Sequence, residues 1–126
     1  MDNNKKVMII DDDKEFLDEI TETLKLSGYE PIPLSESHKA VKEILKIKPD
    51  VVLLDLKMDV VSGFKIANEL DKMPDKAKVP IIAITGVFTE KEHRLLMKTC
   101  GIAECLTKPF NPLDVIAAIE RIYPNE

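Results

Sequence analysis

Polar residues stand at the ends of four short apolar runs in this sequence: Asp11 and Asp12 after the first, Asp55 and Thr85 after two others, and Lys108 after Thr107 at the last. Three carboxylates that meet about 5 Å apart repel one another by roughly 3 kcal/mol per pair at an effective dielectric near 20. Such a cluster needs a cation, and oxygen ligands without a nearby His or Cys favour Mg²⁺, with Mn²⁺ also suitable. A bound metal and Lys108 would neutralise the oxygens of a transferring phosphoryl group, to which Thr85 would donate a hydrogen bond.

The nucleophile in such a transfer would be Asp55, because it ends the buried run VVLL at the centre of the expected sheet. Attack by its carboxylate would form an acyl phosphate. We expect a different role for Asp13, in the first turn of the helix that follows, where an acidic side chain is stabilising. His38 and His93 lie in helical segments away from these residues, and we interpret both as surface or packing residues.

The elements that must position these residues follow from the hydrophobic pattern. Short apolar runs alternate with longer segments of helical periodicity, which predicts an α/β fold of (βα)5 type. The apolar runs are KVMII, PIPL, VVLL, PIIAIT and AECLT, and the expected helices span 14–27, 37–46, 62–73, 89–101 and 111–123. On the first helix, one face carries Phe16, Leu17, Ile20 and Leu24. Strands joined by such helices lie parallel, so helices should cover both faces of the sheet.

Glycine and proline positions refine this architecture. Gly28 follows the first helix where a left-handed cap belongs, and Asn111 with Asp114 gives the last helix a strong start signal. Pro31 and Pro33 interrupt the second strand, which therefore belongs at an edge of the sheet. The doubly wound, flavodoxin-like strand order 2-1-3-4-5 places it there. In that order ligands bind beyond the carboxyl ends of strands one and three, where the polar strand ends converge.

Composition limits the class of protein. With 126 residues the chain is expected to be one domain, 1–126, and to leave no room for an output domain. Its net charge is −5, and without a basic block it gives little support for direct nucleic-acid binding. No apolar run is long enough to span a membrane and the start does not read as a signal peptide, so we expect a cytoplasmic protein. Cys100 and Cys105 are the only cysteines, and we interpret them as small buried side chains.

The segments KVMIIDDD, VVLLDLKMDVVSG, IIAITG and CLTKPF, in this order and spacing, resemble a two-component response-regulator receiver domain of the stand-alone chemotaxis or sporulation-relay type. The resemblance covers essentially the whole chain. It implies that Asp55 accepts a phosphoryl group from the phosphohistidine of a sensor histidine kinase or a histidine phosphotransfer protein. It also implies that Asp12 ligates Mg²⁺ directly, Asp11 mainly through water, and Lys57 through its backbone carbonyl.

The same resemblance implies a conformational switch. Thr85 would move toward the phosphoryl group, Lys108 would pair with it, and a downstream protein target would read the surface of the fourth helix, fifth strand and fifth helix. The protein would be a monomer or a phosphorylation-dependent dimer, and would catalyse only its own phosphorylation and dephosphorylation. Gly63 matches the glycine of the loop after the phosphorylated strand, and a cis peptide bond is implied between Lys108 and Pro109.

Three features depart from the pattern of that family. Asp59 stands where the family usually has proline, and it adds a charge near the acidic site. Cys105 occupies the position of an aromatic residue that swings inward on activation, so output is expected to depend more on Thr85 and its loop. Lys57 and Val87 are at the positions that tune phosphoryl lifetime, and since an apolar Val87 cannot orient an attacking water, we predict a long-lived phosphoryl state.

Two other functions use the same residues. A Mg²⁺-dependent phosphatase or phosphotransferase could use Asp55 as its nucleophile on small substrates. Such an enzyme usually needs a second acid and a cap over its substrate, for which 126 residues leave little room. A flavodoxin-like electron carrier would place a flavin phosphate after the first strand, where the three aspartates at 11–13 would repel it.

Overall fold

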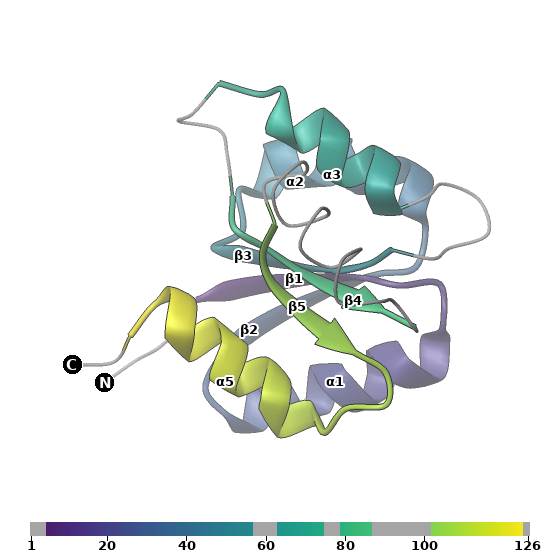
Figure 1. Ribbon diagram of the computed structural model, residues 1–126. Coiled ribbons are helices and arrows are strands. Elements are labelled where there is room, and N and C mark those ends of the chain that lie inside the picture. The colour runs from purple at the N-terminus through teal and green to yellow at the C-terminus, as the bar shows by residue number, and fades with distance from the viewer. Residues whose placement is uncertain (1–4, 57–62, 75–78, 87–101, 125–126) are drawn as a thin grey trace.

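A five-stranded parallel sheet forms the centre of the molecule, between two layers of helices (Figure 1). The computed structural model describes residues 5–56, 63–74, 79–86 and 102–124. The strands stand in the order β2-β1-β3-β4-β5, which confirms the predicted order and places the proline-containing strand at an edge. Their bounds are β1 (Lys6–Ile10), β2 (Glu30–Leu34), β3 (Val51–Asp55), β4 (Ile81–Thr85) and β5 (Ile102–Thr107).

The described helices follow the predicted pattern, and their bounds are α1 (Lys14–Leu26), α2 (Ala40–Ile47), α3 (Gly63–Asp71) and α5 (Pro112–Ile122). The helix expected over 89–101 lies outside the described residues. A 3₁₀ turn over Ser37–Lys39 precedes α2, in place of the α-helical start that we expected, and Glu36 at its N-cap makes no side-chain capping bond. Among these helices, none has the length and apolar character needed to cross a membrane.

The core is divided into two halves by the alternation of side chains along each strand. Val7 and Ile9 of β1 belong to the apolar cluster formed with α1 and α5. Met8 and Ile10 belong to the cluster formed with α2 and α3, on the opposite face. All four side chains are fully buried, since successive residues of a strand point to opposite faces. The sheet is therefore a rigid mount for whatever stands at the ends of its strands.

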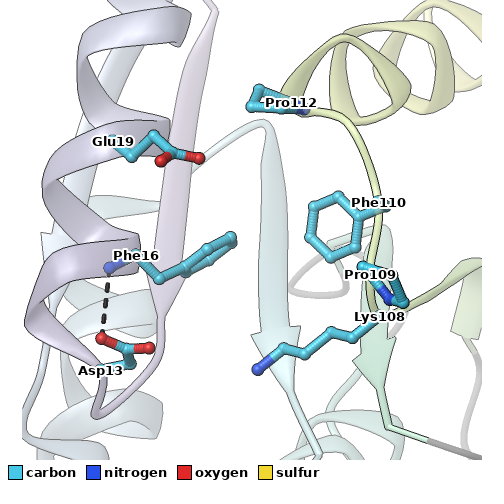
Figure 2. Close-up of a pocket in the computed structure, with 7 residues that line it drawn as sticks. All are labelled: Asp13, Phe16, Glu19, Lys108, Pro109, Phe110 and Pro112. Atoms are coloured by element: carbon cyan, nitrogen blue, oxygen red, sulfur yellow. Dashed lines mark hydrogen bonds between the residues drawn. The ribbon is translucent and has the colours of Figure 1, made fainter.

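On the face covered by α1 and α5, contacts fix the segment that joins β5 to α5. The rings of Phe16 and Phe110 lie edge to face, with centroids 5.8 Å apart, between α1 and this segment (Figure 2). The side chain of Asn111 caps α5 in a capping box. At the other end of α5, the Tyr123 hydroxyl donates a 2.7 Å hydrogen bond to the carbonyl oxygen of Asp50. The segment that follows Lys108 is thus anchored by the ring of Phe110 and by the cap of α5.

Candidate functional site

Three carboxylates gather at the carboxyl ends of β1 and β3. Asp11, Asp12 and Asp55 each offer one oxygen, and these oxygens lie within 4.8 Å of one another. Asp11 follows β1 and is completely buried, Asp55 ends β3 with 4% of its surface exposed, and Asp12 is exposed. Because β1 and β3 are neighbours in the sheet, their ends bring these side chains together as the sequence predicted.

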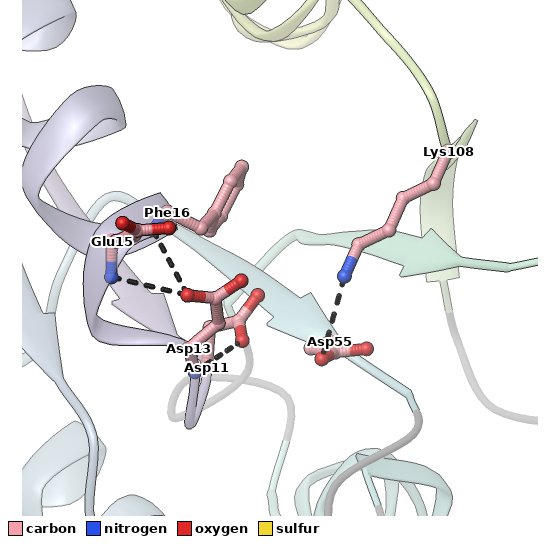
Figure 3. Close-up of polar contacts among 6 residues, drawn as sticks. All are labelled: Asp11, Asp13, Glu15, Phe16, Asp55 and Lys108. Carbon is pink, nitrogen blue, oxygen red and sulfur yellow. Dashed lines mark hydrogen bonds and ion pairs between the residues drawn. The ribbon is translucent and has the colours of Figure 1, made fainter.

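Asp13, the third aspartate of the run, has a structural role. Its Oδ1 accepts hydrogen bonds from the backbone N–H groups of Glu15 and Phe16, at 3.1 and 3.3 Å, which makes it the N-cap of α1. We predicted a first-turn role, and the residue stands just before that turn. Its own N–H donates a 2.9 Å hydrogen bond to Oδ1 of Asp11 (Figure 3). The cap therefore also holds the buried carboxylate in place.

The environment of Asp11 makes its charge costly. Its pKa is raised from 3.8 to about 6, chiefly by burial, with smaller contributions from the negative charges of Asp55 and Asp12. The hydrogen bond from Asp13 and the charge of Lys108 lower its pKa in part. Oδ2 of Asp11 is buried and accepts no hydrogen bond from the described residues. Three oxygen donors, one of them buried and unpartnered, fit a hard divalent cation such as Mg²⁺ or Mn²⁺.

Lys108 approaches the three carboxylates from β5, on the side of the sheet order away from β1. It follows β5, and its side chain crosses the end of β4 to place Nζ 3.8 Å from Oδ2 of Asp55 (Figure 3). The Lys108 side chain is 40% exposed, whereas that of Asp55 is only 6% exposed. The peptide bond between Lys108 and Pro109 is cis, as the resemblance implied. An ammonium group thus stands beside Asp55, the carboxylate that we predicted to be the nucleophile.

Thr85 ends β4 between these two groups. It is 1% exposed, and its Oγ1 has no hydrogen-bond partner among the described residues. Cys105 of β5 lies close by, and burial raises the pKa of its thiol, an effect that the nearby Thr85 hydroxyl partly offsets without the geometry of a full hydrogen bond. Cys105 packs against the cluster on the α2 and α3 side. It packs as a small apolar side chain, as we expected, but it is only partly buried, whereas we expected a buried thiol.

Gly63 allows α3 to begin directly against the end of β3. Its N–H donates a 3.3 Å hydrogen bond to the carbonyl oxygen of Leu56. A Cβ at this position would collide with the carbonyl oxygen of Asp55 and would lie 2.6 Å from Cα of Leu56. Any larger residue would therefore displace the backbone that carries Asp55.

Five residues singled out in the sequence lie in segments that the structure does not describe. Lys57, Asp59, Val87, His93 and Cys100 lie outside the described residues. His38 is exposed in the 3₁₀ turn, in line with our interpretation of it as a surface residue.

Phe16 is a neighbour of the site that the sequence did not reveal. Its ring centroid is 5.8 Å from Nζ of Lys108. The helical periodicity of α1 identified Phe16 only as a residue of the apolar face. The sequence feature that could have indicated the contact is Phe110, an aromatic residue two positions after Lys108 that could pack against another ring.

The chain is similar to known proteins over most of its length. Residues 7–120 match the family model of the response regulator receiver domain. The alkaline phosphatase synthesis transcriptional regulatory protein PhoP of Bacillus subtilis is 29% identical over 119 residues, which are 94% of this chain and 48% of PhoP. The chain spans about half the length of the curated relatives that it matches.

Solved structures give the same result. The signal receiver domain of a DNA-binding response regulator from Colwellia psychrerythraea superposes with a TM-score of 0.84 at 29% identity, over 97% of this chain and 100% of that one. The receiver domain of the Francisella response regulator 1452 shares the fold, with a TM-score of 0.87 at 23% identity over 95% and 97% of the two chains. The chain therefore belongs to the response regulator receiver domain family.

Proposed function

We propose that this receiver domain is a phosphorylation-activated signalling switch in which Asp55 is the phosphoryl acceptor. The donor would be the phosphohistidine of a sensor histidine kinase or of a histidine phosphotransfer protein. The observation that supports this most directly is the position of Asp55, between the ammonium of Lys108 at 3.8 Å and the carboxylates of Asp11 and Asp12. Membership of the receiver family favours this switch over a phosphatase acting on small substrates.

In the transfer, a carboxylate oxygen of Asp55 forms a bond to phosphorus while the bond from phosphorus to the donor imidazole breaks. The electron pair of that bond stays with the imidazole nitrogen, which takes up a proton. Lys108 then neutralises part of the negative charge on the phosphoryl oxygens. Burial of Asp55 keeps its carboxylate poorly hydrated and fixed by β3, so little reorganisation precedes attack.

The acidic cluster would repel an incoming phosphoryl group unless a cation offset its charge. We propose that Asp11, Asp12 and Asp55, with the backbone carbonyl of Lys57, hold Mg²⁺ or Mn²⁺. The metal would supply charge neutralisation for the phosphoryl oxygens. The unpartnered, buried oxygen of Asp11 and the raised pKa of that residue support this assignment.

The output would be a change of conformation rather than catalysis on a second substrate. The Thr85 hydroxyl has no hydrogen bond to lose among the described residues, so it is available to donate to a phosphoryl oxygen on Asp55. A downstream protein target would read the surface of β5 and α5, with or without phosphorylation-dependent dimerisation. We place the protein in the cytoplasm, where it catalyses only its own phosphorylation and dephosphorylation.

The test is direct phosphorylation by a small-molecule donor. Purified protein treated with acetyl phosphate and Mg²⁺ should gain the mass of one phosphoryl group in intact mass spectrometry. Asp55→Asn protein, or wild type in EDTA, should gain none. Equal labelling of Asp55→Asn, or none of the wild type, would refute the assignment.

The output partner and the lifetime of the phosphoryl group on Asp55 are tested by two further measurements. Beryllofluoride, whose fluorines and beryllium stand in for the phosphoryl group, should let the wild type capture an output protein that Asp55→Asn does not. Because Lys57 could shield the phosphoryl group and Val87 cannot orient a water, phosphate release should be slow. Complete release within seconds would contradict the expected long lifetime.

A further inference from the structure

The ring of Phe16 contacts the ammonium of Lys108 and also the ring of Phe110, two residues further along the chain. The ring centroid lies 5.8 Å from Nζ of Lys108. The same ring packs edge to face, at 84°, against Phe110, which is joined to Lys108 through Pro109 (Figure 2). These residues line a pocket of about 400 Å³ between α1 and the start of α5. The Phe16 side chain therefore contacts both the ammonium of Lys108 and the segment that follows the Lys108 backbone.

Lys108 needs such support, because its other contact leaves it considerable freedom. Its side chain is 40% exposed, and Nζ stands 3.8 Å from Asp55, at the outer limit of an ion pair. A lysine carries about 2 kcal/mol of rotamer entropy and a strongly hydrated charge. The face of an aromatic ring attracts an ammonium within about 6 Å of its centroid. The Phe16 ring thus favours those rotamers of Lys108 that lie beside the carboxylates.

Phe16 is in turn fixed by the residues that form the site. Its backbone N–H donates to Oδ1 of Asp13, and the N–H of Asp13 donates to Oδ1 of Asp11 (Figure 3). Asp11 shares the carboxylate cluster with Asp55. The contacts therefore run from the cluster through the cap of α1 to the ring, and from the ring back through Lys108. Because Asp13 accepts from the backbone N–H of Phe16, a substitution of the Phe16 side chain keeps that hydrogen bond and should affect the reacting carboxylate through the lysine.

We propose that Phe16 is a positioning residue that holds the ammonium of Lys108 ready for the phosphoryl oxygens. In this role Phe16 acts on the reaction through the ammonium of Lys108, which its ring faces. The inference rests on the proposed function, because it assumes that Asp55 is phosphorylated.

The test uses acetyl phosphate, because a small donor makes no docking contacts with α1. Phe16→Leu keeps an apolar side chain of similar reach, and Phe16→Tyr keeps the aromatic face. At saturating Mg²⁺, Phe16→Leu should slow phosphorylation of Asp55 by about two- to fivefold, the range for an exposed cation–π contact. Phe16→Tyr should retain the wild-type rate. Because Phe16 is only half-buried, both variants should keep the urea midpoint, and Phe16→Met replaces Phe16→Leu if the latter does not fold.

Two further variants separate positioning from simple packing. Phe110→Leu removes the contact between the rings but leaves the Phe16 face beside the ammonium, so it should slow the reaction less than Phe16→Leu. In Lys108→Met protein, adding Phe16→Leu should cause no further loss. The proposal is overturned if Phe16→Tyr is as slow as Phe16→Leu, if Phe110→Leu is equally slow, or if the loss persists without Lys108. A wild type that takes up no phosphoryl group would refute the proposed function instead.

Discussion

The backbone N–H of Lys108 donates a 2.8 Å hydrogen bond to the carbonyl oxygen of Thr85. This bond ties the segment after β5 to the end of β4. Lys108, which carries the ammonium of the site, and Thr85, which carries its hydroxyl, are therefore joined through their backbones. From that anchor the side chain of Lys108 extends to Asp55. A displacement of the Thr85 backbone would therefore also move the lysine that faces Asp55.

Replacing Lys108 with methionine should tighten Mg²⁺ binding. The ammonium adds positive charge beside Asp55, and a unit charge several ångströms from a divalent ion opposes its binding by about 1 kcal/mol even in water. We expect the dissociation constant in isothermal titration calorimetry to fall about three- to tenfold. Lys39→Met is the matched control, because it removes the same charge from a surface ion pair with Glu36. Weaker binding to Lys108→Met would contradict the proposed metal position.

Replacing Thr85 with valine should stabilise the unphosphorylated protein. The buried Oγ1 of Thr85 lacks a hydrogen-bond partner among the described residues, and an unpaired buried hydroxyl costs roughly 1–3 kcal/mol. Valine has nearly the same shape, so urea unfolding should show a gain of about 1 kcal/mol. The structural response to beryllofluoride should shrink at the same time. The control is Thr107→Val, because Thr107 is the exposed residue of β5 that pairs with Thr85 in the sheet. It should change neither the stability nor the response to beryllofluoride. A loss of stability in Thr85→Val would count against this reasoning.

The parts of the fold and site that could be predicted are those that depend on local pattern and topology. Proline fixed the edge position of β2, and the residues that end strands were certain to meet because parallel strands share one carboxyl edge. Asp55 and Lys108 were found in this way. The contact between Phe16 and Lys108 was missed, because it joins distant parts of the chain and depends on side-chain packing that no spacing encodes. The capping bonds of Asp13 likewise depend on the residue at which α1 begins.

Replacing Gly63 with alanine should destabilise the protein although alanine favours helices. The added Cβ would meet backbone atoms of Asp55 and Leu56, which cannot turn aside as a side chain can. We expect a loss of about 1–3 kcal/mol in urea unfolding, with a reduced stabilisation by Mg²⁺ because the carboxylate of Asp55 is displaced. Gly86→Ala is the control, since no heavy atom lies within 4 Å of its added Cβ. Equal stability of the two variants would exclude the proposed close approach.

Metal-free protein should lose stability as the pH rises from about 4 to about 6, because Asp11 has a pKa of 3.8 when unfolded and about 6 when folded. Between these values the unfolded carboxyl has lost its proton while the folded one retains it. Folding then takes up a proton, and the free energy of unfolding falls with rising pH. A pKa difference of about two corresponds to roughly 3 kcal/mol.

Asp11→Asn should be more stable than the wild type at pH 7 in EDTA, and should respond less to Mg²⁺. Asp18→Asn, at an exposed position of α1, should show the wild-type pH dependence. Urea unfolding at several pH values measures this effect. A metal-free wild type that is as stable at pH 7 as at pH 4 would disprove the assigned cost of burying the Asp11 charge.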